Sequence, residues 1–333
     1  MIVIDKCPST LTKGYTSYSP RALKNLFFGK NVYPFLDFSI SGLKNSGTIT
    51  GAVERISVSG VQEKFSAVID NGLIRLAREG ERSTHILKPA PWDETIVTRR
   101  HIPANEHVTM QIASQVYGIK TAENGVCFSK DQQIVYITKR FDINPEGMKD
   151  EMEDMAVILE RNEQTDGKYF KYSGTYEDVA SGLRKSIPAW MVDMERFFDL
   201  VVFNYVYGNG DDHLKNFSLI RRGTDYRLAP AYDLLNTSLH VQGDDFGLDG
   251  GLSANMLPSD AYANSGHPCR TDFHRFGQLI GLRDLRIGKI LDRYSNIPPL
   301  VLTLLEGSFL PEKMQRSYLR IVKERTARFN RQF

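Results

Sequence analysis

One stretch decides the fold of this chain: Gly208-Asn209-Gly210-Asp211-Asp212-His213-Leu214-Lys215-Asn216-Phe217-Ser218-Leu219-Ile220. Two glycines interrupt the helical pattern that precedes it, so we expect a helix to end here. Asp211 stands five residues before Asn216, and the apolar run after Asn216 is typical of a strand. Polar side chains should therefore converge where a helix, a loop and a strand meet.

The spacing between Asp211 and Asn216 is that of the catalytic loop of protein kinases. There the aspartate accepts the proton of the acceptor hydroxyl, and the asparagine binds Mg²⁺. Two apolar runs that follow, separated by a turn at 222–225, predict a hairpin that brings Asp233 back beside the loop. Asn216 and Asp233 would then supply two oxygen ligands for Mg²⁺. For this spacing taken alone, a polar loop in solvent is the alternative.

Length and composition set broad limits. A chain of 333 residues favours two lobes or domains, and 41% apolar with 25% charged residues is typical of soluble globular proteins. The longest apolar runs are too short to cross a bilayer, and the N-terminus shows no signal peptide. The net charge of +2 argues neither for nor against nucleic acid, and three distant cysteines form no disulfide framework. We therefore expect a cytoplasmic protein.

A loop rich in small residues covers the first half of the segment 56–69. Its second half reads as a strand, and Asn71-Gly72 after it is a strong hairpin signal. With one glycine the loop departs from the kinase pattern G-x-G-x-x-G, so an ordinary loop remains the alternative. As a nucleotide-binding loop it would cover a triphosphate with the backbone of Ser59, Gly60, Val61 and Gln62.

Lys88 ends a predicted strand. A lysine on an internal strand is costly to bury unless an anion meets it, and in a nucleotide site that anion is a phosphate. The helix predicted from Asn105 to Gly118 places Glu106 in its first turn, where it would hold Lys88 or favour the helix N-terminus. A lysine that reaches solvent from an edge strand is the alternative.

The composition changes from strand-rich to helix-rich near residues 139–150. We expect an α+β, two-lobed fold, with an N-lobe at 1–142 and a mainly helical C-lobe at 143–333. Apolar residues at helical spacing mark one helix as core: Met191, Met194, Phe197, Phe198, Val201, Val202 and Tyr205. Helices are predicted at 153–161, 176–185, 188–207, 272–280, 285–294, 298–305 and 311–328.

Two further patterns are weaker signals. The last helix carries a basic side that is either a solvated face or a contact for an acidic partner or DNA phosphates: Lys313, Arg316, Arg320 and Lys323. Asp245-Phe246-Gly247 spells the metal-binding tripeptide of protein kinases. However, Asp245 lies 34 residues beyond Asp211, whereas Asp233 lies 22 beyond and closes the hairpin. We therefore assign the metal site to Asp233.

Six motifs in family order make the chain resemble the HipA-like serine/threonine kinases, the toxins of bacterial toxin–antitoxin systems. They are Ser57-Val58-Ser59-Gly60-Val61-Gln62-Glu63-Lys64, Thr84-His85-Ile86-Leu87-Lys88-Pro89, Asn105-Glu106, Lys139-Arg140-Phe141-Asp142, Gly210 to Ser218, and Pro230-Ala231-Tyr232-Asp233. The resemblance implies a two-lobed protein-kinase-like fold of the HipA type.

The resemblance also assigns roles to individual residues. It implies that Asp211 is the catalytic base, that Asn216 and Asp233 bind Mg²⁺, and that Lys88 binds ATP phosphates. It further implies that His213 or Lys215 contacts phosphate or acceptor, and that Lys139 and Phe141 hold adenine through their backbone. Ser57 matches a loop serine that family members autophosphorylate, and Ser59 is a second candidate. Phosphate there would expel the loop and switch activity off.

Partners follow from the same resemblance. The implied reaction is transfer from ATP to a serine of an aminoacyl-tRNA synthetase. The implied partner is a HipB-like helix-turn-helix antitoxin, with DNA reached only through it and no membrane. The N-terminus is shorter than in long family members, as in the compact HipT-like branch with its separate small HipS-like protein. Whether the antitoxin contacts this chain directly is left open.

Two other functions are alternatives. A small-molecule phosphotransferase of the aminoglycoside-kinase type also uses an Asp-x4-Asn loop, but the loop at 57–64 argues against it. An inactive kinase-fold module that binds antitoxin or DNA would not need Lys88, Asp211, Asn216 and Asp233 together.

Overall fold

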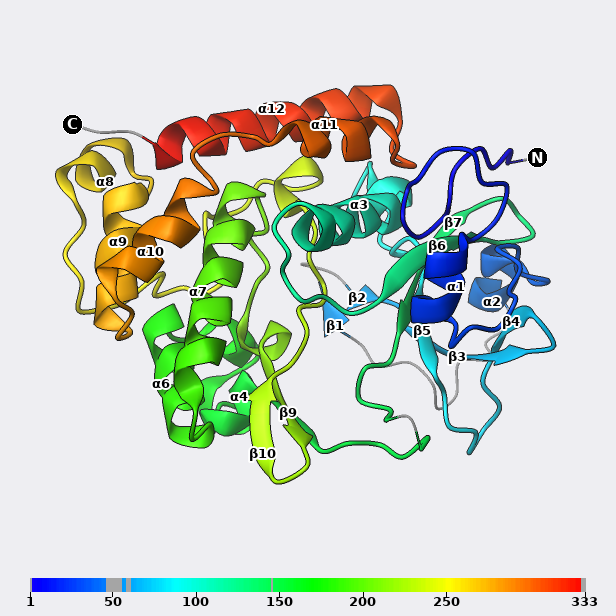
Figure 1. Ribbon diagram of the computed structural model, residues 1–333, viewed down its shortest axis with the longest axis horizontal. Coiled ribbons are helices and arrows are strands. Elements are labelled where there is room, and N and C mark those ends of the chain that lie inside the picture. The colour runs from blue at the N-terminus through cyan, green and yellow to red at the C-terminus, as the bar shows by residue number, and fades with distance from the viewer. Residues whose placement is uncertain (1, 46–55, 58–60, 145, 331–333) are drawn as a thin grey trace.

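The computed structural model describes residues 2–45, 56–57, 61–144 and 146–330 (Figure 1). A strand-rich part carries the N-terminus and a largely helical part follows it. Helix α11 (Pro299–Glu306) contacts α3 (Ile102–Gln115) of the first part, while α12 (Glu312–Phe329) contacts α7 (Trp190–Val206) of the second. Helices α11 and α12 together therefore contact both parts of the structure.

The N-lobe is built on an antiparallel sheet with the strand order β4-β3-β5-β7-β6. Asn71 and Gly72 have φ angles of 48° and 79°, as the two-residue turn between β3 and β4 requires, so the predicted hairpin is confirmed. The central strand β5 carries Lys88. The elements of this part are α1 (Pro20–Leu26), α2 (Ile40–Asn45), β3 (Phe65–Asp70), β4 (Leu73–Leu76), β5 (His85–Lys88), β6 (Asn124–Phe128) and β7 (Ile134–Lys139).

Helix α3 packs against β6 and β7, and every residue from Ile102 to Ala113 is buried. It begins at Ile102, three residues before the predicted start, because Pro103 has the backbone angle of a first helical turn. Glu106 therefore lies in the second turn, and its predicted place in the first turn is wrong. At this depth Glu106 faces β5 and is no longer a helix-terminal charge.

The C-lobe consists of helices and a three-stranded antiparallel sheet, β10-β9-β8. The hairpin β9–β10 forms as predicted, but residues 153–161 do not make one helix: β8 (Met152–Asp154) pairs with β9, and Asp154 then caps α4 (Met155–Ile158). The remaining elements are α5 (Glu163–Asp166), α6 (Tyr176–Ser186), β9 (Ser218–Arg222), β10 (Asp225–Leu228), α8 (Asp260–Ser265), α9 (Arg270–Leu279) and α10 (Asp284–Asp292). None of the helices in the described part of the chain is long and apolar enough to cross a bilayer.

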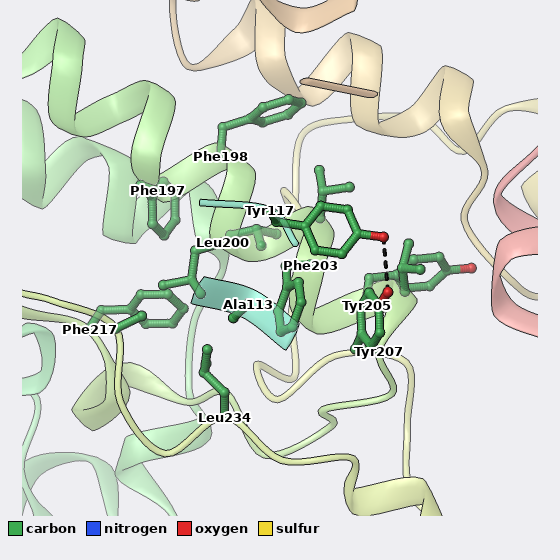
Figure 2. Close-up of a cluster of buried hydrophobic side chains, with 14 of the residues drawn as sticks. Ala113, Tyr117, Phe197, Phe198, Leu200, Phe203, Tyr205, Tyr207, Phe217 and Leu234 are labelled. Carbon is green, nitrogen blue, oxygen red and sulfur yellow. Dashed lines mark hydrogen bonds between the residues drawn. The ribbon is translucent and has the colours of Figure 1, made fainter. Parts of the chain in front are cut away.

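Helix α7 runs through the main hydrophobic core, as its apolar stripe predicts (Figure 2). Phe203 stacks on Tyr207 with ring centroids 4.5 Å apart, and Tyr117 of the N-lobe meets Phe203 edge-on and hydrogen-bonds the Tyr207 hydroxyl at 2.9 Å. Met191 is 63% exposed, so its assignment to the core is wrong. It lies in the first turn of α7, before the buried face begins.

We expect Phe203→Ala to lower the free energy of unfolding by about 3–5 kcal/mol, because the ring is fully buried and leaves a cavity. Urea denaturation followed by circular dichroism measures the change. Leu285→Ala is the control: the side chain is 70% exposed, and its loss should matter by less than about 0.5 kcal/mol. Equal midpoints for the two variants would contradict this packing.

Candidate active site

Four charged groups from separate parts of the chain meet around Lys88. The Lys88 ammonium lies 2.6 Å from Glu106 Oε1 and forms an ion pair with Asp233 Oδ1. Lys64, which immediately precedes β3, places its ammonium 3.1 Å from Asp233 Oδ2. The predicted contact between Glu106 and Lys88 is therefore present, and the hairpin end brings Asp233 to the same point.

Burial and charge act against each other in this cluster. Burial lowers the pKa of Lys88, but Asp233 and Glu106 outweigh it and hold that pKa above its ordinary value. Burial likewise raises the pKa of Asp233, but Lys64 and Lys88 hold it well below the ordinary value. Asp233 is therefore an ionised carboxylate in a sheltered position, which suits a hard oxygen ligand.

The backbone at Asp233 takes an uncommon conformation, with φ of 58°. The preceding residue fixes this turn, since the Tyr232 hydroxyl lies 2.6 Å from Ser218 Oγ and donates to the Lys215 carbonyl at 2.7 Å. Tyr232 thus ties the end of the hairpin to the stretch that contains Asn216. These contacts hold Asp233 and Asn216 beside the same space.

A cavity of about 670 Å³ lies between the sheet and the helical part. Its wall includes Lys64 and Lys88 on one side and Asn216, Ser218 and Tyr232 on the other. This volume is within the usual range for small-molecule and cofactor sites. The predicted site residues that line it are Lys88, Lys139, Phe141, Lys215, Asn216 and Asp233.

Asp211 is not part of the cavity wall, but its carboxylate interacts with Asp233 and Lys64, which are part of it. Asp211 is held by a residue that the sequence did not single out. The Tyr172 hydroxyl donates to Asp211 Oδ1 at 2.8 Å. Burial raises the pKa of Asp211 to about 7, against the opposing effects of Lys171 and the Tyr172 hydroxyl. The pKa of Asp211 is therefore close to neutral pH, as a general base needs.

The other members of the loop support its shape. The Asp212 side chain accepts from Asn204 Nδ2 and from the Gly247 backbone, each at 3.0 Å. Asn216 Oδ1 accepts from the backbone of His213 at 3.1 Å. The His213 ring is fully buried, and burial lowers its pKa to about 3, so the imidazole is neutral. His213 does not line the cavity, unlike Lys215.

The remaining predicted residues lie at the edges of the site. The Lys139 ammonium donates to the Asn25 carbonyl at 2.9 Å, so its side chain is held by the N-terminal segment. The Phe141 ring lies against Tyr232, with centroids 5.7 Å apart. Ser57 of β1 (Ile56–Ser57) pairs with Val61 of β2 (Val61–Gln62). Ser59 and Gly60 lie outside the described residues.

Two residues of the site were missed, for different reasons. Lys64 ends the motif at 57–64, but the sequence analysis assigns it no role. A lysine directly after a small-residue loop is nevertheless a signal that could predict a phosphate-binding residue. Tyr172 lies 39 residues before Asp211, and nothing in the local pattern connects them.

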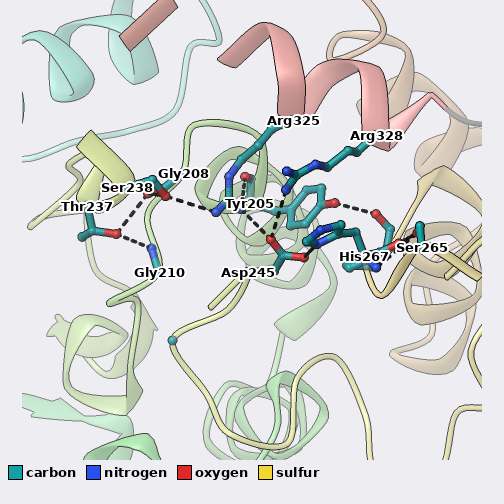
Figure 3. A network of polar contacts seen from close by, with 12 residues as sticks. Tyr205, Gly208, Gly210, Thr237, Ser238, Asp245, Ser265, His267, Arg325 and Arg328 are labelled. Atoms are coloured by element: carbon teal, nitrogen blue, oxygen red, sulfur yellow. Dashed lines mark hydrogen bonds and ion pairs between the residues drawn. The ribbon is translucent and has the colours of Figure 1, made fainter. Parts of the chain in front are cut away.

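None of the residues of the tripeptide Asp245-Phe246-Gly247 lines the cavity. The Asp245 side chain lies among basic side chains and Tyr205 (Figure 3). Asp245 Oδ1 lies 3.2 Å from the Arg325 guanidinium of α12, and its Oδ2 lies 2.7 Å from His267 Nδ1. Figure 3 also shows Thr237 accepting from the Gly210 backbone, at 2.8 Å. Asp245 therefore anchors a segment whose Gly247 holds Asp212.

Comparisons with known proteins show which family the chain resembles. Residues 56–298 match the family described as HipA-like C-terminal domain. The Haemophilus influenzae protein named "Putative kinase" is 25% identical over 347 residues, covering 97% of this chain and 95% of that protein. The Sinorhizobium fredii protein "Putative kinase Y4dM" is 33% identical over 210 residues, covering 57% of this chain and 47% of that protein.

A solved structure has the same fold. Shewanella oneidensis HipA, in a complex with HipB and operator DNA, matches with a TM-score of 0.64 and 19% identity, over 87% of this chain and 70% of the solved chain. The predicted two-lobed α+β fold of the HipA type, with a strand-rich N-lobe and a mainly helical C-lobe, is confirmed.

We expect Gly247→Ala to disturb the loop, because a Cβ there would lie 2.4 Å from the Asp212 nitrogen. Overpacking against backbone should lower the free energy of unfolding by about 1–3 kcal/mol, measured by urea denaturation. Gly243→Ala is the matched control, since its Cβ would meet nothing within 4 Å. A Gly247→Ala midpoint equal to that of the control would show that the close approach to Asp212 is not required.

Proposed function

Because the chain belongs to the HipA-like C-terminal domain family, we propose that it is a serine/threonine protein kinase that uses ATP and Mg²⁺. One observation carries the proposal: Lys88, Asn216 and Asp233 line a single cavity of nucleotide size, and the Asp211 carboxylate interacts with Asp233. A lysine held by a helix glutamate, together with two oxygen ligands and a base, is the set of groups that phosphoryl transfer uses.

The residues present fit a magnesium ion. Asp233 offers an ionised carboxylate and Asn216 an amide oxygen, and both line the same cavity. Mg²⁺ prefers such oxygen ligands and completes its shell with water and phosphate oxygens. When bound, it neutralises charge on the phosphates of the nucleotide.

The protein's own groups then have distinct tasks. Lys88, positioned by Glu106, binds nucleotide phosphates, and Lys64 adds a second positive charge to the same wall of the cavity. The backbone at Lys139 and Phe141 holds adenine. Asp211 accepts the proton of the acceptor hydroxyl, so the chain contributes mainly position and electrostatic stabilisation.

The finer parts of the proposal concern partners and regulation. The acceptor is a serine of an aminoacyl-tRNA synthetase, and Ser57 or Ser59 is the site of inhibitory autophosphorylation. The Shewanella complex of HipA with HipB and operator DNA supports a HipB-like antitoxin as partner. In the proposal, DNA is reached only through this antitoxin. Membership of the compact HipT-like branch, with a separate small HipS-like protein as partner, and a cytoplasmic location are also part of the proposal. The lobes divide near residue 142.

Incubation of the purified chain with γ-labelled ATP and Mg²⁺, followed by mass spectrometric mapping, tests the activity. We expect phosphate on Ser57 or Ser59, and its loss in both Asp211→Asn and Asp233→Ala, because these remove the base and a metal ligand. A folded Asp211→Asn variant with unchanged transfer would remove Asp211 from the mechanism. If wild-type protein takes up no label, its intact mass separates a chain already phosphorylated from an inactive binding module.

The pH dependence follows from the pKa of Asp211, which burial raises to about 7. A base acts when deprotonated, so the rate of transfer should rise as pH increases through about 7 and should fall roughly tenfold per unit well below it. Initial rates between pH 5.5 and 8.5, corrected for the Asp211→Asn background, measure the curve. A rate that is flat above pH 5.5 would indicate an aspartate of ordinary pKa.

A further inference from the structure

Tyr172 is a polar residue near the proposed base to which the proposed mechanism assigns no role. It ends the short 3-10 helix η2 (Phe170–Tyr172), in the connection between α5 and α6, far from the catalytic loop in sequence. Its hydroxyl nevertheless donates to Asp211 Oδ1 at 2.8 Å. The contact joins two segments of the C-lobe at the residue proposed as the base.

Contacts on several sides fix the tyrosine. Its ring meets His213 edge-on, with centroids 5.2 Å apart and planes at 75°. The Lys171 ammonium lies 4.7 Å from the centre of the Tyr172 ring. The Tyr172 carbonyl accepts from the Asp249 backbone at 2.9 Å, which connects it to the segment that also holds Asp212. Such a fixed hydroxyl can orient a carboxylate, whereas a freely rotating one cannot.

A hydrogen bond to one carboxylate oxygen leaves the other for the acceptor. The carboxylate plane is then set by Tyr172, and the rotation that would misalign the second oxygen is prevented. The charged groups around Asp211 are Lys171 and Lys64, which favour its ionised form, and Asp233, which opposes it. Asp212, next in the chain, accepts its own bonds from Asn204 and Gly247.

We propose that Tyr172 is a positioning residue that orients the Asp211 carboxylate for proton acceptance, and whose hydrogen bond favours the ionised form. The inference rests on the proposed kinase function for the role of Asp211 as a base, and on the 2.8 Å contact between Tyr172 and Asp211 for its geometry. Tyr172 touches neither nucleotide nor acceptor in this role. It acts on the reaction through Asp211.

Tyr172→Phe tests the proposal, because it removes the hydroxyl and keeps the ring against His213. The midpoint of the pH–rate curve should move up by roughly one unit, since a hydrogen bond to a charged group is lost. The rate near pH 6.5 should fall several-fold, and the plateau at high pH should stay below that of the wild type because the carboxylate is no longer oriented, while the KM for ATP stays unchanged. Tyr169→Phe is the matched control: this tyrosine of the same segment is 67% exposed, and its curve should overlie the wild type.

A measurement without turnover separates the two proposals. Carbon NMR of protein labelled at the aspartate carboxyl carbons follows Asp211 through the same pH range, with Asp211→Asn to assign its signal. The Asp211 midpoint should rise in Tyr172→Phe and not in Tyr169→Phe. An unchanged midpoint overturns the role of Tyr172 even if the chain is an active kinase. A raised midpoint in a chain that transfers no phosphate upholds the contact and removes the kinase function instead.

Discussion

The structure depends on one buried ammonium group, that of Lys88. It is 3% exposed on the central strand of the sheet, and such a charge is tolerable only when carboxylates meet it. Glu106 comes from α3 of the same lobe, and Asp233 comes from the end of the β9–β10 hairpin. Because loss of either carboxylate would leave buried charge unbalanced, this cluster holds the hairpin end against the sheet. The cavity lies where the two parts meet.

The two adjacent carboxylates of the loop show how the same residue type serves different ends. Burial raises the pKa of both Asp211 and Asp212 to about 7. Asp212 is 2% exposed and accepts bonds from Asn204 and Gly247, so its oxygens are used in holding the loop to its surroundings. Asp211 accepts from Tyr172 on one oxygen and lies near the lysines of the cavity. Asp212 therefore supports the loop, whereas Asp211 is the carboxylate proposed as the base.

The sequence predicted those elements whose conformation depends mainly on residues that are close together in the chain. The turn at Asn71, the β9–β10 hairpin and helix α7 depend on backbone conformation or on apolar period, and both are visible in sequence. The helical pattern after residue 152 failed because Met152–Asp154 pairs with β9, a partner more than 60 residues away. The role of Tyr172 was not predicted for the same reason, since its contact with Asp211 is a tertiary contact between residues far apart in the sequence. The role of Lys64 was not predicted for another reason. The motif that contains it is visible in the sequence, but its ion pair with Asp233 forms only when the hairpin folds back.

Asp245-Phe246-Gly247 shows that the role of a motif depends on its position in the fold and not on its sequence alone. The hairpin end brings Asp233 to the cavity wall through an uncommon backbone angle, and this placement is why the metal site is proposed there. Asp245 does not line this cavity: its carboxylate contacts Arg325, Arg328 and His267, which draws the segment against α12. This anchoring in turn places the Gly247 amide on Asp212. The tripeptide therefore contributes to the loop's shape through backbone and ion pairs, and the C-terminal helix becomes part of what keeps Asp211 in place.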